Sequence, residues 1–550
     1  MSKTTLSLAR LAAEVTCFAM QVGLEDSTTK SPACERIALE KDMQNKTRRQ
    51  FLNGAGLSTG VLLIPRWATG LSATKPSDKL TVACIGVGSQ GTRVMLDLLR
   101  MSEVQVVAVC DVNQQSSDYL DWGNDELRKK VRLLLQQPGW GNSFAGPTAG
   151  RATAQSITNQ FYAKEKSKPT YNGCSTYEDF RELLSKEKDL DAVVISTPDH
   201  WHALIAVTAM RAGKHVYSQK PMAHSVGEAR WMAKVAKDTG RATQVSIFNS
   251  QTPESRRVIE VLRNGVIGRV TRVDIWTKRA SAFWKQGLAT PTSGDPIPAG
   301  LNWNAWLGPA PSRPYNHVYL PFVWRAWYDY GCGAIGDMGE YGLDTIARSL
   351  DLGPADRVEA SSTELFPDCY PVASRLNYRF PSAIGKSTVE LHWYDGGIKP
   401  ERPAELDIDI PMSVDNEGVL YTGDHGKLLT GFMAQEPRVL SPNGKLTPAA
   451  APAPRVDQPF QVSRPELGGS ASSADVLHYS EWIRACHGGP PASANYEFEA
   501  PVAESLMLGN IAIRTREALE WDTTSFHFKR GSQKAQALLM PLYRAPWTVT

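Results

Sequence analysis

Four side chains in the sequence can together carry out acid–base chemistry. Asp337, Tyr341 and Asp344 are spaced by four and then three residues, so a helix would present them on one face. Lys220 follows an apolar, strand-like run and precedes Pro221, which restricts it to an extended backbone. A phenol, an amine and carboxylates can move a hydroxyl proton when they share a site. The alternatives are an exposed loop lysine and a helix whose polar face merely packs on another domain.

A glycine-rich run predicts a dinucleotide site. The run consists of Gly86, Val87, Gly88, Ser89, Gln90 and Gly91, between a strand-like and a helical pattern. The first glycine permits a sharp turn, the second a close approach to a pyrophosphate, and the third close packing of helix and strand. Asp111 ends the next strand-like run twenty residues after Gly91, where its carboxylate can bind ribose hydroxyls. We therefore expect NAD, with NADP as the alternative cofactor. A purely structural glycine turn is the competing interpretation.

A polar loop with Thr197, Pro198, His200 and His202 follows a third apolar run, Asp191–Ser196. Ligands of open parallel sheets collect at the carboxyl ends of the strands, so we expect this loop to line the cofactor site. The two histidines have no third ligand at zinc spacing, and we expect no metal.

From Lys79 to about Phe528 the sequence resembles the Gfo/Idh/MocA family, which includes glucose-fructose oxidoreductase and inositol dehydrogenase. The family's Glu-Lys-Pro loop corresponds to Gln219-Lys220-Pro221, which keeps the lysine and changes the acid. The resemblance implies that Lys220 contacts both the nicotinamide ribose and the substrate. It also implies that His202 lines the nicotinamide pocket.

The family's second motif, D-x-x-x-H-x-x-D, is matched by Asp337, Tyr341 and Asp344, with Tyr341 in place of the histidine. In the glucose-fructose oxidoreductase branch a tyrosine stands there and transfers the proton, which the resemblance implies for Tyr341. A phenol is poorly ionised at pH 7 unless a cation lowers its pKa, and we expect Lys220 to supply that cation. Lys220, Tyr341 and Asp337 are therefore the expected catalytic residues.

Aromatic and charged side chains upstream of Asp337 favour a carbohydrate or cyclitol substrate. They are Trp303, Trp306, Trp324, Arg325, Trp327, Tyr328 and Tyr330. Aromatic faces stack on sugar rings, and Arg and Asp bind hydroxyl groups, so Trp324, Arg325 and Asp344 are the expected substrate contacts. For any single tryptophan, a place in the core is the alternative.

The expected function is an NAD(P)-dependent oxidoreductase that transfers a hydride between nicotinamide and a secondary alcohol of a sugar, sugar derivative or cyclitol. Some relatives with tightly held NAD cleave glycosides through transient oxidation, so NAD-dependent glycoside hydrolysis is the alternative, and net consumption of NAD would separate the two. A non-catalytic sugar sensor is a third possibility, against which Lys220, Asp337 and Tyr341 weigh.

The order of the elements predicts an α/β chain with two domains. Strand-like runs alternate with helical patterns over residues 74–247, which indicates a parallel Rossmann sheet. The expected strands are Leu80–Ile85, Val104–Cys110, Asp191–Ser196, Lys214–Ser218 and Thr243–Ile247. Residues 248–550 indicate a second α/β domain with a large, mostly antiparallel open sheet, through which we expect homo-oligomers to form. Asn113–Tyr171 is interpreted as an insertion, and 441–473 as an irregular surface loop.

Residues 1–73 carry the features of an export signal. Arg48-Arg49 precedes the mildly apolar stretch Asn53–Ile64 and a small-residue end, the layout of a twin-arginine signal, and Met43 is the expected start. The signal implies export in the folded state by the twin-arginine machinery. We therefore expect a periplasmic or otherwise exported protein with tightly bound cofactor. An ordinary amphipathic helix is the alternative.

The amino-acid composition argues against nucleic acid and a membrane as partners. Sixty Lys+Arg against 57 Asp+Glu leave a net charge of +3 over 550 residues, too small for a typical nucleic-acid surface. We find no run of 18 or more apolar residues and expect no membrane span. Pairing among Cys174, Cys332, Cys369 and Cys486 is left open by the sequence.

Overall fold

The computed structural model describes residues 78–279, 284–384, 387–451 and 474–547. The expected export signal with Arg48 and Arg49, and most of the expected loop 441–473, lie outside these ranges.

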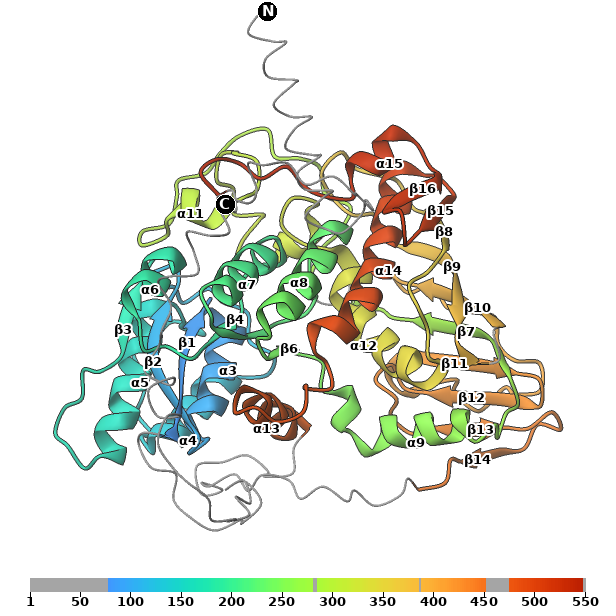
Figure 1. Cartoon of the computed structure of the whole chain (residues 1–550), viewed down its shortest axis with the longest axis horizontal. Helices are drawn as coiled ribbons and strands as arrows, with labels where there is room; N and C mark the ends of the chain where they lie inside the picture. Colours follow the sequence, from blue (N-terminus) through green and yellow to red (C-terminus); the bar gives the residue numbers. More distant parts are fainter. Residues whose placement is uncertain (1–77, 280–283, 385–386, 452–473, 548–550) are drawn as a thin grey trace, which may run out of the picture. The chain divides into compact units, whose positions relative to one another are not determined.

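The first domain contains a six-stranded sheet in the order β3-β2-β1-β4-β5-β6, with every neighbouring pair parallel (Figure 1). The strands are β1 (Leu80–Ile85), β2 (Val104–Cys110), β3 (Ser175–Tyr177), β4 (Ala192–Ile195), β5 (His215–Ser218) and β6 (Thr243–Val245). Most side chains of β1, β2 and β4 are apolar on both faces, because helices cover both sides of a parallel sheet. All five predicted strands are confirmed, and the short edge strand β3 was missed.

Helices connect these strands. They are α3 (Ser89–Leu99), α4 (Glu126–Leu135), α5 (Arg151–Glu165), α6 (Phe180–Lys186), α7 (His202–Arg211) and α8 (Val226–Thr239). The segment interpreted as an insertion, Asn113–Tyr171, contains α4 and α5 and is the crossover from β2 to β3. Helix α5 packs Ile157 and Phe161 into the core, and the Tyr162 hydroxyl accepts a hydrogen bond from the Val106 N–H at 2.8 Å.

The second domain contains a ten-stranded sheet in the order β14-β13-β12-β11-β7-β10-β9-β8-β15-β16. Its strands are β7 (Val270–Trp276), β8 (Arg357–Ser362), β9 (Ser374–Ser382), β10 (Ser387–Tyr394), β11 (Gly418–Gly423), β12 (Gly426–Thr430), β13 (Arg438–Leu440), β14 (Leu446–Pro448), β15 (Leu519–Asp522) and β16 (His527–Arg530). Only β7 and β10 pair in parallel; the other neighbouring pairs are antiparallel. The α/β class and the order of the two sheets are as predicted.

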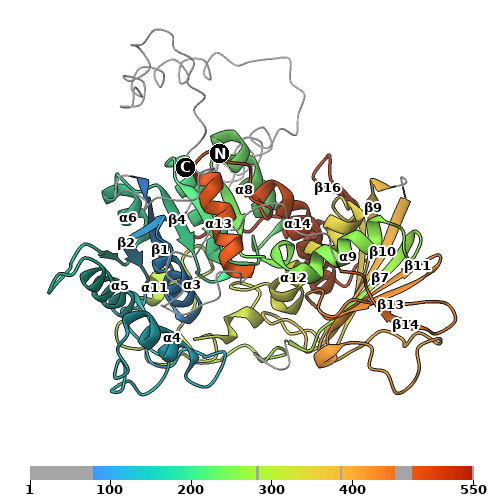
Figure 2. The same ribbon diagram turned by 90° about the horizontal axis from the view of Figure 1, so that it is seen from below.

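Three helices cover one face of this sheet and separate it from the first domain: α9 (Pro253–Arg263), α12 (Gly333–Leu350) and α14 (Tyr496–Thr515) (Figures 1 and 2). The shorter helices are α11 (Trp303–Leu307), α13 (Ala474–Cys486) and α15 (Gln533–Ala537). Helix α13 returns to the first domain, where the His478 imidazole lies 2.8 Å from the Val245 carbonyl oxygen of β6. Late residues of the chain therefore complete the first domain.

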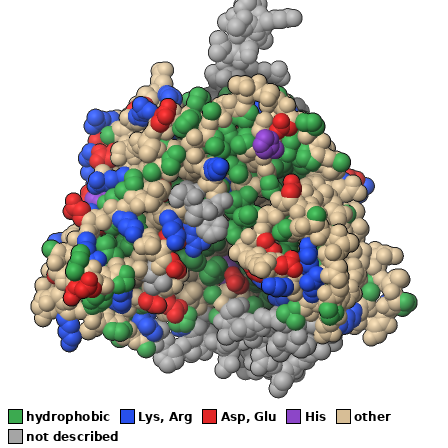
Figure 3. Space-filling model, turned by 180° about the vertical axis from the view of Figure 1, so that it is seen from behind, with side chains coloured by type: hydrophobic (Ala, Val, Ile, Leu, Met, Phe, Trp, Pro, Cys, Tyr) green, Lys and Arg blue, Asp and Glu red, His purple; other side chains and the backbone are tan. Residues whose placement is uncertain are grey.

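On the face shown in Figure 3, basic and acidic side chains are interspersed, in line with the small net charge. No helix in the described ranges combines the length and hydropathy needed to cross a bilayer. The six cysteines within those ranges are free thiols.

Close packing of α14 on β9 holds α12 in place, and a glycine makes it possible. A Cβ atom on Gly509 would lie 1.9 Å from the Tyr378 hydroxyl oxygen and 2.7 Å from Leu376 Cδ2. We expect Gly509→Ala to lower the free energy of unfolding by roughly 1–3 kcal/mol through overpacking. The urea unfolding midpoint measures this. Gly353→Ala is the control, because its Cβ would have no neighbour closer than 3.8 Å; equal midpoints for the two variants would contradict the packing argument.

Candidate active site

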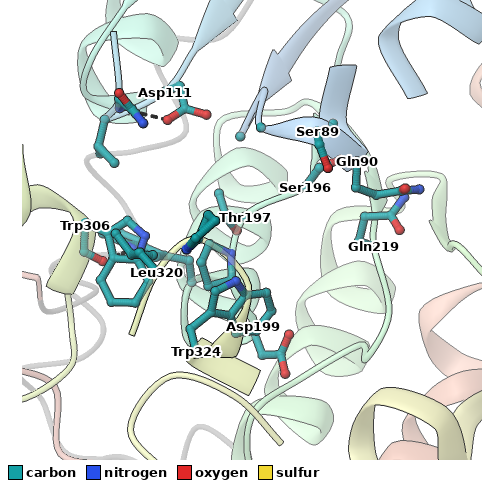
Figure 4. A pocket seen from close by; sticks show the side chains of 18 of the residues that line it. Ser89, Gln90, Asp111, Ser196, Thr197, Asp199, Gln219, Trp306, Leu320 and Trp324 are labelled. Carbon is teal, nitrogen blue, oxygen red and sulfur yellow. Dashed lines mark hydrogen bonds between the residues drawn. The ribbon is translucent and has the colours of Figure 1, made fainter. Parts of the chain in front are cut away.

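A cavity of about 610 Å³ lies between the carboxyl edge of the six-stranded sheet and the second domain. Asp111 lies at one end of it, and Asp199 lies beside Trp324 at the other (Figure 4). The predicted site residues that line it are Gly86, Gly88, Ser89, Gln90, Gly91, Asp111, Thr197, Pro198, Lys220, Trp324, Arg325, Asp337 and Tyr341. The chain thus brings together residues more than 250 positions apart.

The glycine-rich run turns sharply between β1 and α3. Gly86 has a φ of +81°, and a Cβ there would lie 2.6 Å from the Ser196 carbonyl carbon. A Cβ on Gly91 would lie 1.9 Å from the Gly86 carbonyl oxygen. No side chain caps the N-terminus of the eleven-residue helix α3, so its first N–H groups and its dipole are available to an anion.

Asp111 fixes this run from the end of β2. Its Oδ2 accepts a hydrogen bond from the Val87 N–H at 2.7 Å, and its Oδ1 accepts one from the Asn113 N–H at 2.8 Å. Burial raises the pKa of Asp111 to about 6, although both backbone hydrogen bonds oppose the shift. A carboxylate offers about four acceptor positions, so Asp111 can still bind a ribose.

Three unpartnered polar atoms test whether a dinucleotide fits. Ser196 Oγ, Thr197 Oγ1 and Gln219 Nε2 are buried, line the cavity and have no hydrogen-bond partner in the described part of the chain (Figure 4). Buried polar groups are normally hydrogen-bonded, and a ligand rich in hydroxyl, amide and phosphate groups would satisfy them. The residues present therefore fit NAD.

Two predicted cofactor contacts are wrong in detail. The Val87 side chain is fully buried in the core, so only its N–H serves the site, through Asp111. The His202 ring does not line the cavity: its Nδ1 lies 2.7 Å from the Pro221 carbonyl oxygen and its Nε2 lies 3.0 Å from the Thr197 carbonyl oxygen. It therefore ties two cavity-lining loops together from behind.

An ion cluster joins the two domains at the cavity. Lys220 Nζ, just after β5, lies 2.9 Å from Asp337 Oδ1 of α12 and donates to the Asp337 backbone carbonyl at 2.6 Å. The Arg325 Nε donates to the same Oδ1 at 3.0 Å. Burial acts to raise the pKa of Asp337, but Lys220 and Arg325 outweigh it and hold the pKa below its usual value. Asp337 is therefore an ionised anchor.

Tyr341 lies one helical turn after Asp337, with Lys220 Nζ 5.0 Å from its ring centroid. The expected lowering of its pKa is wrong. Burial, followed by the negative charge of Asp337, raises the pKa of the Tyr341 phenol well above 10. The ammonium faces the ring and not the hydroxyl group, so the phenol keeps its proton at neutral pH.

Two of the three predicted substrate contacts line the cavity, and the third does not. Trp324 and Arg325 line the cavity, and the Arg325 guanidinium lies 4.1 Å from the Trp324 ring centroid. Asp344 does not line it, because its Oδ1 accepts from Arg348 Nε at 2.8 Å and the carboxylate is fully buried. The prediction for Asp344 is therefore wrong: the i,i+4 partner Arg348 holds the side chain inside the second domain.

Sequence reasoning missed several cavity residues. Asp199, 1% exposed, accepts a hydrogen bond from the Cys332 N–H at 3.0 Å, and burial raises its pKa to about 7 against the opposing charge of Arg325. Tyr119 packs over Gly88, where a Cβ would lie 3.0 Å from its ring, and Trp122 donates to Gln90 Oε1 at 3.2 Å. The polar loop after β4 was a signal for Asp199, whereas nothing in the sequence pointed to the two aromatic residues.

Within the described ranges, no group of three or more His, Cys, Asp or Glu side chains is arranged to hold a metal ion. A parallel sheet with an uncapped glycine-loop helix, unpartnered polar groups in the cavity and a second α/β domain define the class: a two-domain, dinucleotide-binding Rossmann protein.

Family models agree with this class. Residues 145–247 match the model described as an oxidoreductase family NAD-binding Rossmann fold, and residues 251–383 match its C-terminal alpha/beta domain. Residues 145–247 and 251–383 are thus similar to the two domains of the Gfo/Idh/MocA oxidoreductase family, whose Rossmann domain is described as NAD-binding.

Curated relatives include a glycosyl hydrolase family 109 protein of Shewanella baltica (strain OS155), 26% identical over 245 residues. An alpha-N-acetylgalactosaminidase of Shewanella oneidensis is 25% identical over 245 residues. Each match covers 42% of this chain and 45% of the relative, so the chain spans less than half the length of these relatives.

Solved structures with a similar arrangement include an aldose-aldose oxidoreductase from Caulobacter crescentus complexed with glycerol, with a TM-score of 0.47 and 17% identity over 80% of this chain and 100% of that one. An NAD binding oxidoreductase from Klebsiella pneumoniae has a TM-score of 0.49 and 18% identity over 80% of this chain and 99% of that one.

The position of Asp111 leads to a test of cofactor choice. We expect Asp111→Ala to weaken NAD by roughly tenfold or more, because a hydrogen bond to a charged group contributes about 1.5–3 kcal/mol. NADP should weaken less, since the change also removes repulsion of the 2′-phosphate. Titration calorimetry with both cofactors measures this. Asp118→Ala, a cavity carboxylate with no bond to the glycine-rich run, is the control. Equal losses of NAD and NADP affinity in Asp111→Ala would contradict the assignment.

Proposed function

We propose that the chain is an NAD-dependent oxidoreductase that transfers a hydride between nicotinamide and a secondary alcohol of a sugar, sugar derivative or cyclitol. The observation that carries the proposal is the Lys220–Asp337 ion pair in the same cavity as the glycine-rich run. The pair provides a donor and a fixed charge where a substrate hydroxyl would meet the cofactor.

The side chains have separate tasks in this proposal. Bound NAD supplies the hydride acceptor. Lys220 orients the substrate oxygen by a charge-assisted hydrogen bond, and Asp337 holds Lys220 in place. The protonated Tyr341 donates a hydrogen bond into the cavity, since no described group accepts from its hydroxyl. Trp324 presents an aromatic face to the apolar side of a sugar ring, and Arg325 binds hydroxyl groups.

The walls of the cavity support a tightly held cofactor. Trp122, from the β2–β3 crossover, packs edge-on against Phe322 of the second domain with ring centroids 5.5 Å apart. At the other end, Trp547 packs on Trp201 at 5.0 Å, and the Arg181 guanidinium lies 4.1 Å from the Trp547 ring centroid. All of these side chains line the cavity, and on their aromatic contacts we rest the proposal of a resident cofactor that is recycled by a second substrate.

Glycoside hydrolysis through transient oxidation is the second candidate, favoured by the names of the curated relatives. It would use the same hydride acceptor and the same Lys220, but would return the hydride within one turnover. The two reactions differ in whether reduced cofactor accumulates.

The function is tested with purified protein in two steps. Denaturation should release a ligand with the mass and absorbance of NAD. The protein is then supplied with NAD and D-glucose, myo-inositol or p-nitrophenyl N-acetyl-α-D-galactosaminide. We expect NADH absorbance to rise with a sugar or cyclitol. Nitrophenol release without NADH would favour hydrolysis, and no turnover of any compound would contradict the proposal.

Lys220→Met is the variant that links this activity to the site. Turnover should fall by roughly 10²-fold or more, because the oriented donor is lost. NADH binding and the unfolding midpoint are measured alongside. Lys234→Met, at a solvent-exposed i,i+4 ion pair of α8, is the control and should leave turnover unchanged.

We further propose that the protein is exported through the twin-arginine machinery, on the basis of Arg48-Arg49 and the mildly apolar stretch behind them. Replacement of both arginines by lysine should leave the precursor in the cytoplasm, as seen by fractionation and immunoblotting. Mature protein in the periplasm of the variant strain would contradict this. We also propose, as a separate point, that copies of the chain associate through the ten-stranded sheet.

A further inference from the structure

We propose that Asp199, at the substrate end of the cavity, accepts the hydroxyl proton during alcohol oxidation. This rests on the proposed function and assigns its base. Asp199 lies in the turn after β4, lines the cavity, and stands beside Trp324 (Figure 4).

The geometry leaves Asp199 free to act. Its Oδ2 accepts from the N–H of Cys332, the N-cap residue of α12, so the carboxylate lies at a helix N-terminus that favours negative charge. The Cys332 thiol donates elsewhere, to the Ala223 carbonyl oxygen at 3.7 Å, so the Cys332 N–H is the one donor to Asp199 among the described residues. One of about four acceptor positions is therefore used, and the remaining capacity is available to a substrate hydroxyl.

The other groups of the cavity are poorly suited to take the proton. Asp337 is occupied by Lys220 and Arg325, which hold its pKa low. The pKa of Tyr341 is raised, so the phenol is protonated already. Glu340 is fully buried outside the cavity, with its Oε1 accepting from a backbone N–H.

Several charged and titratable groups act on Asp199 from the elements around it. Lys220 follows β5, and Arg325 lies in the short turn Val323–Ala326. The others are Cys332 at the N-terminus of α12, Asp337 and Glu340 within α12, and Tyr370. Burial raises the pKa of Asp199, Arg325 and Lys220 lower it, and Asp337 raises it. The balance places the pKa at about 7, which suits a group that must both accept and release a proton near neutral pH.

The reaction balances with this assignment. Oxidation breaks the C–H bond of the alcohol, whose electron pair leaves as the hydride that NAD accepts, and the O–H bond, whose proton passes to the Asp199 carboxylate. The electrons of the O–H bond form the second bond of the carbonyl group. In the reverse direction the protonated Asp199 returns the proton to the oxygen.

Asp199→Asn tests the proposal, because the amide oxygen can still accept from the Cys332 N–H while the base is removed. We expect kcat for the panel compound that the parent oxidises fastest to fall by roughly 10²-fold or more. In the parent, oxidation should rise with pH through about 7, as Asp199 ionises, and this limb should be lost in the variant. NADH affinity and the unfolding midpoint should stay near those of the parent.

A second readout does not depend on turnover. In the infrared difference spectrum across pH 7, the parent should show protonated carboxyl bands from Asp199 and Glu228, and Asp199→Asn should lose one of them while the Glu228 band stays. Glu228→Gln is the matched control: Glu228 is buried on α8 outside the cavity, and burial raises its pKa to about 7 as well. That variant should lose an infrared band but keep the pH limb of kcat.

The outcomes separate the two proposals. If Asp199→Asn keeps the parental kcat and pH limb, Asp199 is not the base, while the oxidoreductase function stands. If the parent oxidises no compound of the panel, the proposed function fails. The infrared titration then decides whether Asp199 exchanges a proton near neutral pH, and absence of its band overturns the assignment.

Discussion

The ion pair between Lys220 and Asp337 is the constraint on which the site depends. It connects the end of β5 in the first domain to α12 in the second, and both side chains are largely buried, at 13% and 8% exposed. Removing one partner of a buried pair leaves an uncompensated charge, which costs several kcal/mol. The two domains are therefore held in the one arrangement that keeps Asp337 between Lys220 and Arg325, and the cavity has its shape because of it.

The same cluster separates the acid–base properties of neighbouring groups. Asp337 receives both cations and keeps a low pKa, whereas Asp199 and Tyr341 are buried and have raised pKa values. Groups of one chemical type thus differ in protonation because their partners differ. A site with an ionised anchor, a group poised near pH 7 and a protonated phenol can hold a substrate oxygen and exchange its proton without moving the backbone.

Local patterns in the sequence predicted the first domain well and the site in part. The boundaries of β1 and β2, the glycine-rich run and Asp111 follow from short-range rules, as does the helical spacing of Asp337 and Tyr341. Asp199 acquires its role from Cys332, 133 positions away, which no local pattern encodes. Asp344 was misassigned because helical spacing gives a face but not the partner that faces it. His202 was misassigned because a resemblance of motif does not show which way a ring points.

The crossover from β2 to β3 supplies part of the wall of the cavity beside the glycine-rich run. In a glycine-rich run of this kind, the second glycine leaves room for a pyrophosphate. Here the Tyr119 ring lies within 3.0 Å of the position of a Gly88 Cβ, and Trp122 bridges from Gln90 to Phe322. A dinucleotide bound to this helix N-terminus would lie against these aromatic side chains, which line the cavity. The cofactor end and the substrate end of the cavity are thus built from different parts of the chain, the first from the β2–β3 crossover and the second from Trp324, Arg325 and α12.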